Sequence, residues 1–505
     1  PLFTASYTGV NAGLVIAVAD DPGMHSSQNE QDSRHYARAS KTMMLEPADS
    51  AECLEFAKAA FALSERFDTP VLLRLSTRVS HSRSLAQVRP RDEIALRTYE
   101  KKPRKFVMMP AMAKERHTFV EQRILCQVEW AESCALNRVE YHGKKIGVIC
   151  SGINYQYAKE ALGDGASYCK LGCVYPLPVQ LLKDFCAQCE TVYVAEDLDD
   201  YMEQHCKTLG LRVHGKDVFP LEGEFSQNLV AKAILGTKAA NPAPHTAQTD
   251  LKREAVVPQR PPVLCAGCPH RGLFFALKRL NVFVSGDIGC YTLGSMAPLG
   301  MMDTCVCMGA SVSGLHGRNK ARPAEASKAV AVIGDSTFIH SGVTGLINIA
   351  YNQSNSVVVI LDNSITGMTG HQQNPTTGRT LKGDPTATVN LEALCKAVGI
   401  ANVMVADPYD LAATERLLKK ALESGGPAVV ISRRPCVLLK HVPRKPALCV
   451  NGNCVGCKQC MKIGCPAVSI KNRRAAIDAT QCVGCGVCAQ MCKFGAMESY
   501  ESFRK

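Results

Sequence analysis

Cysteines are concentrated at the carboxyl end of this 505-residue chain, where the last 57 residues hold nine of its 25 cysteines. Eight of the nine form two runs, each opening with the spacing C-x2-C-x2-C: Cys454, Cys457, Cys460 and Cys465, then Cys482, Cys485, Cys488 and Cys492. Three thiolates at this spacing let one loop wrap three irons of a cubane. Zinc sites usually pair C-x2-C across a long gap, so zinc or disulfides fit poorly. The runs therefore predict iron–sulfur clusters and electron transfer.

The pairing of these cysteines follows from a resemblance to two-cluster ferredoxins, in which the fourth cysteine of each run binds the other cluster. This predicts one [4Fe–4S] cluster on Cys454, Cys457, Cys460 and Cys492, and a second on Cys482, Cys485, Cys488 and Cys465. Four residues precede the last cysteine of the first run, where the bacterial pattern has three, and Lys493 follows the second run instead of proline. We expect both departures to change loop shape more than ligation.

Two further groups of polar residues each follow an apolar strand: Gly334-Asp335-Ser336 and Asp362-Asn363-Ser364. A diphosphate with Mg²⁺ takes a carboxylate, an amide oxygen and a backbone carbonyl, which Asp335, Asn363 and Ile365 can supply. Gly334 lets the backbone approach the phosphates. The groups resemble the thiamine-diphosphate motif GDG…NN, with Ser336 and Asp362 as departures. A plain strand–turn–helix is the alternative, because Gly-Asp at a strand end is common.

Alternating strands and helices must position these groups, so the sequence predicts an α/β fold. Buried parallel strands are expected at residues 14–19, 70–75, 145–150, 191–195, 329–333 and 356–361, and helices at 48–67 and 271–280. A basic, proline-bearing segment over 89–120 predicts a solvated loop, and a proline-rich polar segment over 241–262 predicts a second linker.

Composition narrows the possible classes of protein. With 46% apolar and 21% charged residues the chain is typical of globular domains, and its formal charge of +12 forms no long basic stripe that would favour nucleic acid. No apolar run is long enough for a membrane span, and no signal peptide opens the chain. We therefore expect a cytoplasmic protein whose cysteines are thiols and cluster ligands, with no nucleic-acid or membrane partner.

Several motifs, in their order along the chain, resemble one family. They lie at residues 20–32, 171–172, 175–178, 265–270, 286–290, 308–311 and 366–375. Together with the groups above they resemble the 2-oxoacid:ferredoxin oxidoreductases, most closely the alpha subunits of the indolepyruvate ferredoxin oxidoreductases, over essentially the whole chain.

The resemblance implies several parallel-sheet thiamine-diphosphate-enzyme domains followed by a small α+β ferredoxin-like domain. The implied boundaries are an incomplete pyrimidine-binding domain at 1–95, a linker at 96–140, a transketolase C-terminal-like domain at 141–237, a linker at 238–262, a thiamine-pyrophosphate-binding domain at 263–440 and the two-cluster domain at 445–505.

The resemblance also implies a reaction in which thiamine diphosphate and Mg²⁺ support oxidative decarboxylation of an arylpyruvate. Coenzyme A takes the acyl group, and two electrons pass through the clusters to ferredoxin; a beta subunit completes the enzyme. Two alternatives remain open: another 2-oxoacid such as pyruvate, or an electron-carrier subunit whose α/β domains only scaffold partners.

Further site residues are implied by the family match alone. Cys265, Cys268, Cys290 and Cys436 are candidates for a third [4Fe–4S] cluster beside the thiamine, with buried structural thiols as the alternative. His270, Met308 and Gly309 are expected near the cofactor. His371 is a candidate catalytic residue that donates a proton or orients the substrate carboxylate, although a lone histidine in a polar loop more often only forms hydrogen bonds.

The chain begins abruptly within an α/β unit, so we expect that a stretch is missing at its amino end. The glutamate that activates thiamine is expected upstream of Pro1, with Glu30 as the nearest acidic candidate inside the domain. Since a positioned proton acceptor contributes on the order of 100- to 10,000-fold, the chain as given is expected to be inactive or very weak.

Overall fold

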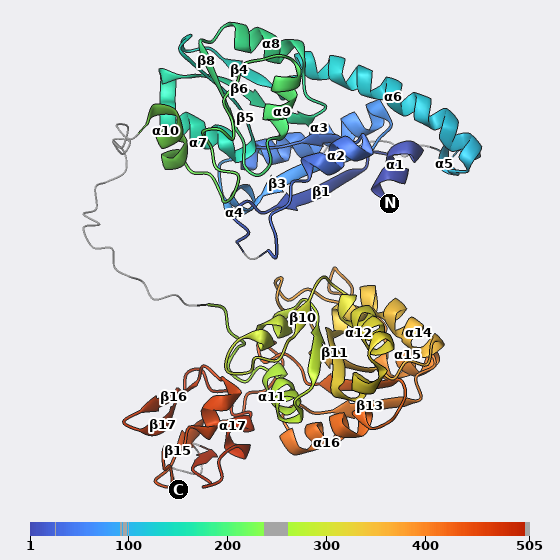
Figure 1. Ribbon diagram of the computed structural model, residues 1–505, viewed down its shortest axis with the longest axis vertical. Coiled ribbons are helices and arrows are strands. Elements are labelled where there is room, and N and C mark those ends of the chain that lie inside the picture. The colour runs from blue at the N-terminus through green and yellow to red at the C-terminus, as the bar shows by residue number, and fades with distance from the viewer. Residues whose placement is uncertain (26, 91–92, 94–97, 99, 237–260, 500–505) are drawn as a thin grey trace. The chain divides into compact units, whose positions relative to one another are not determined.

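The computed structural model describes residues 1–505 except 26, 91–92, 94–97, 99, 237–260 and 500–505. The chain divides into two compact units, Pro1–Glu254 and Ala255–Lys505, which we call unit 1 and unit 2. Each unit has its own sheets and apolar cores (Figure 1). Most of the predicted linker over 238–262 lies outside the described residues.

The first sheet of unit 1 has the strand order β1-β3-β2-β7. Its strands are β1 (Val15–Asp20), β2 (Met43–Leu45), β3 (Val71–Ser76) and β7 (Cys173–Tyr175). The first three are parallel, whereas β7 pairs antiparallel with β2. Because β7 comes from the second half of the unit, the segments predicted as separate domains at 1–95 and 141–237 share this sheet.

The helices of this half are α1 (Leu2–Thr8), α2 (Arg34–Ser40), α3 (Ser50–Phe67), α4 (Thr77–His81), α5 (Pro103–Phe106) and α6 (Pro110–Ser133). Helix α3 confirms the helix predicted over 48–67. It begins where the Asp49 side chain accepts a hydrogen bond from the Glu52 N–H at 2.9 Å, and it ends at Asp68 in the left-handed region.

Helices α5 and α6 correct the predicted solvated loop over 89–120, which is wrong at residues 103–106 and from residue 110 onward. Pro110 occupies the first turn, where its missing N–H costs no hydrogen bond. The buried positions of the helix are Val120, Arg123, Gln127 and Ala131, at helical spacing. Two of these four are polar, so no apolar stripe revealed the helix in the sequence.

The second sheet of unit 1 has the order β4-β6-β5-β8. It contains β4 (Arg138–Glu140), β5 (Ile146–Ser151), β6 (Ser167–Leu171) and β8 (Thr191–Ala195), with helices α7 (Gly152–Leu162), α8 (Gln180–Ala187), α9 (Tyr201–Thr208) and α10 (Gln227–Leu235). Strands β5 and β8 confirm those predicted at 145–150 and 191–195.

Buried ion pairs connect the two halves of unit 1. Arg34 donates to Asp32 and, across the halves, to Glu196, and all three side chains are almost fully buried. Arg74 donates to Glu46 at 2.6 Å. Burial alone would raise the pKa of Asp32, but the guanidinium groups of Arg34 and Arg74 hold it well below its usual range. We call Asp20, Asp32, Arg34, Glu46, Arg74 and Glu196 the ionic network of unit 1.

Unit 2 is built around a six-stranded parallel sheet of order β10-β9-β11-β12-β14-β13. The strands are β9 (Phe283–Gly286), β10 (Thr304–Cys305), β11 (Ala329–Gly334), β12 (Val357–Asp362), β13 (Asn402–Ala406) and β14 (Ala428–Arg433). Strands β11 and β12 are buried throughout, as their continuous apolar sequences predict.

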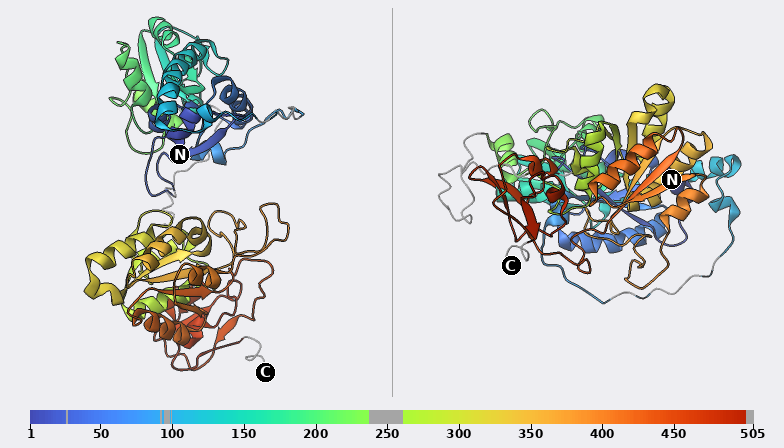
Figure 2. Two further views of the ribbon diagram at one scale, coloured as in Figure 1. Left: turned by 90° about the vertical axis from the view of Figure 1, so that its right-hand side faces the viewer. Right: turned by 90° about the horizontal axis from the view of Figure 1, so that it is seen from below.

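Helices cover both faces of this sheet (Figures 1 and 2). On one face α11 (His270–Leu280) and α16 (Leu411–Leu422) contribute to one apolar core, and on the other α12 (Ala310–Ala321), α14 (Val343–Tyr351) and α15 (Leu391–Ala397) contribute to a second. The helices do not cover the carboxyl-terminal ends of the strands. The short helix α13 (Asp335–Thr337) follows β11 at this end.

A small α+β region ends the chain and packs against the α11–α16 face. It contains two antiparallel pairs, β15 (Leu448–Val450) with β18 (Met497–Ser499) and β16 (Val468–Lys471) with β17 (Arg474–Ile477), and the helix α17 (Val487–Gln490). Leu411 of α16 belongs to its apolar core, and Phe275 of α11 packs on that core. This region and the domain of the six-stranded sheet are therefore joined through an apolar contact within unit 2.

All 25 cysteines are free thiols. Across the described ranges, none of the helices has both the length and the apolar character needed to cross a bilayer.

Candidate functional site

A cavity of about 280 Å³ lies where β9, β11 and β12 end. Ligands of open parallel sheets bind at this edge. The cavity is lined by the turns that follow the three strands, including Asp335, Ser336, Asn363 and Ile365. The structure thus brings together the three residues that the sequence predicts as Mg²⁺ ligands.

Asp335 is a buried carboxyl group with no basic side chain paired to it among the described residues. Its Oδ1 accepts the Ser336 N–H at 2.9 Å, and its Oδ2 accepts the Thr376 hydroxyl at 3.0 Å. Burial raises the pKa of Asp335 to about 6, and the charge of nearby Asp362 adds to the rise. A buried carboxylate without a countercharge is unfavourable, and a bound cation would remove that cost.

Asp362 has a different environment from its neighbour Asn363. Asn363 lines the cavity, whereas Asp362 does not. The Asp362 Oδ2 accepts a hydrogen bond from the Arg433 Nε at 2.7 Å, and Arg433 also pairs with Glu392. Asp362 therefore ties the end of β12 to β14, and the structure gives it no contact with the cavity.

The Met308–Gly309 turn is held by Asp287, which the sequence analysis placed only inside a motif. The buried Asp287 Oδ2 accepts the Gly309 N–H at 2.9 Å and the Ser311 N–H at 3.1 Å. Gly309 has φ +89°, and a Cβ there would lie 2.7 Å from the Ser341 Cβ, so only glycine fits. Met308 then lines the cavity. The Ser311 Oγ is buried and, among the described residues, has no hydrogen-bond partner.

Asn374 and Thr376 are site residues that the sequence analysis missed. The buried Asn374 Oδ1 accepts hydrogen bonds from the Thr376 N–H at 2.8 Å and hydroxyl at 2.6 Å. The Thr376 hydroxyl shares its single proton between the Asn374 Oδ1 and the Asp335 Oδ2, so the segment after β12 positions the carboxyl group. Asn374 falls within the 366–375 motif, which was the available signal; Thr376 lies just beyond it.

The two candidate histidines occupy different settings. His270 is buried in the cavity wall, edge-on to Tyr291 with ring centroids 6.0 Å apart. Burial lowers the pKa of His270 to about 4, so its imidazole is neutral near pH 7. His371 is exposed and does not line the cavity.

Cys265, Cys268, Cys290 and Cys436 lie near one another, and Cys290 lines the cavity. Burial raises the pKa of Cys290, and the neighbouring thiols of Cys436 and Cys265 add to the rise. Burial raises the pKa of Cys268 to about 12, with smaller contributions from Cys265 and Cys290. The residues predicted for a third cluster therefore gather beside the predicted cofactor.

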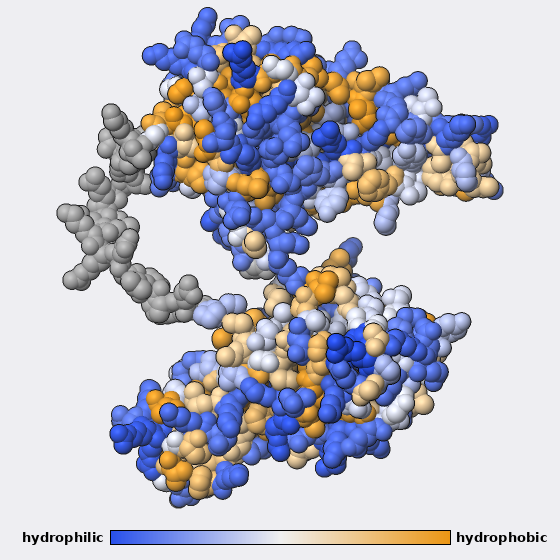
Figure 3. All heavy atoms as spheres, viewed as in Figure 1, coloured by the Kyte–Doolittle hydropathy of each residue, from blue (hydrophilic) through white to orange (hydrophobic). Residues whose placement is uncertain are grey.

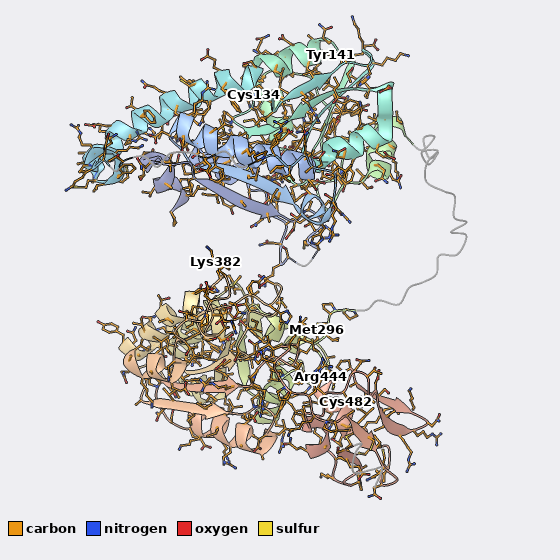
Figure 4. All side chains as sticks on the ribbon, turned by 180° about the vertical axis from the view of Figure 1, so that it is seen from behind. Cys134, Tyr141, Met296, Lys382, Arg444 and Cys482 are labelled. Atoms are coloured by element: carbon orange, nitrogen blue, oxygen red, sulfur yellow. The ribbon has the colours of Figure 1, made fainter. Side chains whose placement is uncertain are left out.

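The carboxy-terminal cysteines form two groups. The first, which we call the outer thiol group, consists of Cys454, Cys457, Cys460 and Cys492, and all four line one small cavity. The second, the inner thiol group, is Cys465, Cys482, Cys485 and Cys488. Burial raises the pKa of Cys488 to about 12, and after burial the other three thiols of the group raise it most. Each group takes its fourth member from the other run, as the ferredoxin pattern predicts. Figure 4 labels Cys482 in this region and Lys382 in the loop between β12 and α15.

Arg271 connects the loop of the inner thiol group to the C-x2-C turn of Cys265 and Cys268. Its guanidinium donates to the carbonyls of Leu264 and Cys265 on one side and of Ile463 and Gly464 on the other. Across from it, the Tyr409 hydroxyl donates to the Gly267 carbonyl. The structure places the C-x2-C turn directly against the loop that carries Cys465.

In unit 1, Glu30 accepts hydrogen bonds from the backbone N–H groups of Gly23 and Gly223. Its carboxylate therefore fixes the loop after β1 to a later loop of the same unit.

Three family models match parts of the chain. They are "Pyruvate flavodoxin/ferredoxin oxidoreductase, thiamine diP-bdg" at residues 13–146, "Thiamine pyrophosphate enzyme, C-terminal TPP binding domain" at 287–432, and "4Fe-4S binding domain" at 475–498. The second covers the residues that line the cavity apart from His270, and the third covers the second cysteine run. The fold and the site thus define a thiamine-pyrophosphate-dependent oxidoreductase that carries an iron–sulfur domain.

Curated relatives narrow the class. An indolepyruvate oxidoreductase subunit IorA of Archaeoglobus fulgidus is 37% identical over 99% of this chain and 84% of its own length. The IorA subunit of Thermococcus kodakarensis is 40% identical over 97% of this chain and 82% of its own length. The chain belongs to the family of indolepyruvate oxidoreductase IorA subunits. A solved 2-oxoglutarate:ferredoxin oxidoreductase from Magnetococcus marinus overlaps 35% of this chain and 65% of its own, at 23% identity and a TM-score of 0.31.

Proposed function

We propose that this chain is the thiamine-diphosphate-binding subunit of an enzyme that oxidatively decarboxylates arylpyruvates of the indolepyruvate class. Coenzyme A takes the acyl group, a partner beta subunit completes the enzyme, and a ferredoxin takes the electrons. The observation that carries the proposal is one cavity that combines an unpaired buried carboxyl group, Asp335, with a thiol, Cys290, from a group of four. Decarboxylation and removal of electrons can then occur at one place.

The donor set of the cavity fits Mg²⁺ and a diphosphate. The carboxylate of Asp335, the amide oxygen of Asn363 and the carbonyl of Ile365 are the oxygen ligands that Mg²⁺ accepts. Gly334, Ser336, Met308 and Gly309 bring backbone close to the diphosphate. When bound there, thiamine diphosphate would supply a nucleophilic carbon for the 2-oxoacid and an electron sink for the charge left on loss of CO2.

The chain's own residues then orient the cofactor and the substrate. Thr376 and Asn374 hold Asp335 in place, and Asp287 holds the Gly309 turn. His270, neutral and buried, forms part of the cavity wall. A direct role for His371 and cofactor binding by Asp362 stay predictions to which the described contacts add no support.

Three [4Fe–4S] clusters complete the proposal. Cys265, Cys268, Cys290 and Cys436 hold the first beside the cofactor, the inner thiol group holds the second, and the outer thiol group holds the third. The predicted domain boundaries stay a prediction: α6 lies inside the segment 96–140, and β7 of the segment 141–237 joins the sheet of the segment 1–95. Free thiols throughout the chain favour a reducing compartment such as the cytoplasm.

A panel of 2-oxoacids tests the substrate. The holoenzyme, with its partner subunit, is assayed anaerobically with coenzyme A and a viologen acceptor on indolepyruvate, phenylpyruvate, pyruvate and 2-oxoglutarate. We expect the aryl substrates to give the highest kcat/KM. A preference for pyruvate would show that pyruvate is the substrate, and no turnover with any 2-oxoacid by a holoenzyme that binds thiamine diphosphate would contradict the proposal.

Asp335→Asn is the diagnostic variant for the site, because it removes the only anionic ligand proposed for Mg²⁺. We expect loss of thiamine diphosphate binding by calorimetry, with the cluster absorbance retained. Asp164→Asn is the matched control, since the Asp164 side chain is 85% exposed in unit 1 and should change neither quantity.

A further inference from the structure

The ferredoxin-like region carries a strong positive charge. Residues 440–499 contain nine lysines and arginines but only two acidic residues, Asp478 and Glu498, so this segment supplies seven of the chain's formal charge of +12. Four thiolates on an oxidised [4Fe–4S] core leave about two negative charges per cluster, and two such clusters would not offset the excess. The remaining positive charge is available to an external partner.

Three of these cations belong to the loops that carry the outer thiol group or contact them. Lys458 lies between Cys457 and Cys460 in the sequence, and Lys493 follows Cys492. Arg473 lies at the turn between β16 and β17, where its carbonyl oxygen would be 2.1 Å from a Cβ placed on Gly456. All three side chains are exposed, and within the described residues none forms an ion pair. They therefore present unneutralised charge beside the thiols.

An apolar centre adjoins the outer thiol group and Lys458. Val455 is 63% exposed and Phe494 is 47% exposed, and both line the small cavity that contains the outer thiol group. Cys457 of that group is itself exposed. Figure 3 shows apolar residues set among hydrophilic ones over the ferredoxin-like elements. An exposed apolar centre with a charged rim is typical of a protein-docking surface.

The inner thiol group is less exposed than the outer one: none of its four cysteines is exposed, although Cys485 lines a separate cavity. Arg271 and Tyr409 of the thiamine-binding domain lie against it, and Gly464, next to Cys465, lies against Pro298. Cys460 of the outer group lies near Cys488 of the inner group. The thiol groups thus follow one another from the cofactor cavity to the surface, and the outer group comes last.

We propose that Val455, Cys457, Lys458, Arg473, Lys493 and Phe494 form an outlet surface on which an acidic electron-carrier protein of the ferredoxin class docks to accept electrons from the outer cluster. The identity of the electron source rests on the proposed function, but the docking does not. In each encounter one reduced [4Fe–4S]⁺ cluster becomes [4Fe–4S]²⁺ and the carrier's cluster gains that electron. No bond or proton changes.

The experiment uses the full chain with its clusters reconstituted anaerobically and reduced by stoichiometric dithionite, so that no thiamine chemistry is needed. Stopped-flow absorbance follows electron transfer to an oxidised acidic ferredoxin. We expect the second-order rate constant to fall as the NaCl concentration rises from about 20 to about 500 mM, because salt screens exposed charges. Lys458→Glu with Lys493→Glu should lower the constant at least about tenfold at low salt and abolish most of the salt dependence.

Two controls separate docking from cluster damage. Lys419→Glu with Lys420→Glu makes the same charge change on α16 and should leave the constant within about twofold of the unmodified chain. Methyl viologen, a small dication, should be reduced by the outlet variant no more slowly than by the unmodified chain.

Equal rates in the outlet variant and the unmodified chain, or an equal loss in the α16 control, would overturn the proposal. If the outlet variant fails to hold its clusters, the salt dependence of the unmodified chain decides, and a flat profile rejects the proposal. Weakened association with the partner subunit, without any change in ferredoxin reduction, would reassign the surface to that subunit.

Discussion

Buried charged side chains have different partners in the two units. In the ionic network of unit 1, Arg34 is paired with Asp32 and Glu196, and Arg74 is paired with Asp20 and Glu46. In unit 2 the buried carboxyl of Asp335 has no cation among the described residues, and Arg271 is bonded only by backbone carbonyls there.

The difference indicates where each unit obtains its countercharge. Unit 1 supplies its own, so its network works as internal architecture. In unit 2 the Asp335 carboxylate can pair with a bound cation, and the Arg271 guanidinium lies beside cysteines. Burial lowers the pKa of Arg271, whereas Cys465 and Cys268 raise it. Unit 1 has exceptions. Carbonyls and Ser6 bond Arg123, and burial lowers its pKa to about 10. Asn154 and the Phe225 N–H donate to the buried Asp197, and burial raises its pKa. We therefore expect the stability of unit 2, more than that of unit 1, to depend on what it binds.

The largest effect is expected from Arg34→Ala, which leaves Asp32 and Glu196 buried without their partner. Breaking a buried pair typically costs about 3–5 kcal/mol. Trp130, the single tryptophan, packs edge-on against Phe67 in unit 1, so its fluorescence during urea unfolding reports on that unit. Arg78→Ala is the control: Arg78 pairs with Glu224 but is 56% exposed, and the loss should stay below about 1 kcal/mol. Equal losses would show that the network contributes no more than a surface pair.

Asp335→Asn should act in the opposite way on stability and binding. Thiamine diphosphate affinity at limiting Mg²⁺ should fall at least about 100-fold, since the anionic ligand is gone. The cofactor-free fold should be no less stable, because an unpaired buried carboxyl is replaced by a neutral amide. Asp362→Asn is the matched control at a neighbouring carboxylate. It should keep the thiamine diphosphate affinity within a few-fold, although it loses the ion pair with Arg433. Calorimetry and thermal melts measure the two quantities.

Removal of iron tests whether unit 2, in which Arg271 contacts the inner thiol group, depends on bound groups more than unit 1 does. Anaerobic treatment with a chelator should lower the melting temperature of unit 2 by several degrees, since ligands that bind only the folded state stabilise it. The Trp130 transition of unit 1 should move by less than about 1 °C, because none of the proposed cluster ligands lies there. Differential scanning calorimetry beside fluorescence measures both. Parallel shifts in the two transitions would mean that the units do not differ in this respect.

The smallest effect is expected from mild acid. The pKa of Asp32 is lowered in the folded state, so its contribution is present above the unfolded value of 3.8 and is lost as pH falls below it. The urea midpoint reported by Trp130 should therefore be flat with respect to this group from pH 7 to 5 and decline below about pH 4. Arg34→Ala should reduce that decline; an unchanged pH profile would show that the pair does not set it.

The sequence revealed those parts of the molecule that rest on spacing within a short segment. The cysteine runs, the strand ends at Gly334 and Asp362, and helix α3 are of this kind. Helix α6 was missed because Arg123 and Gln127 interrupt its apolar stripe. Thr376 was missed because its hydrogen bond to Asp335 joins residues 41 positions apart. The role of Asp362 could not be separated from that of Asn363, since only the fold shows that Arg433 takes its carboxylate.

Strand β7 has a consequence for how the protein is made. The ribosome completes β1, β2 and β3 early, but the strand that covers the free edge of β2 emerges only with residues 173–175. Until then the nascent sheet has an open edge, and unpaired strand edges invite association with other chains. A pause or a premature stop between β3 and β7 should therefore release an aggregation-prone product, and translation speed over this stretch should influence the yield of folded chain.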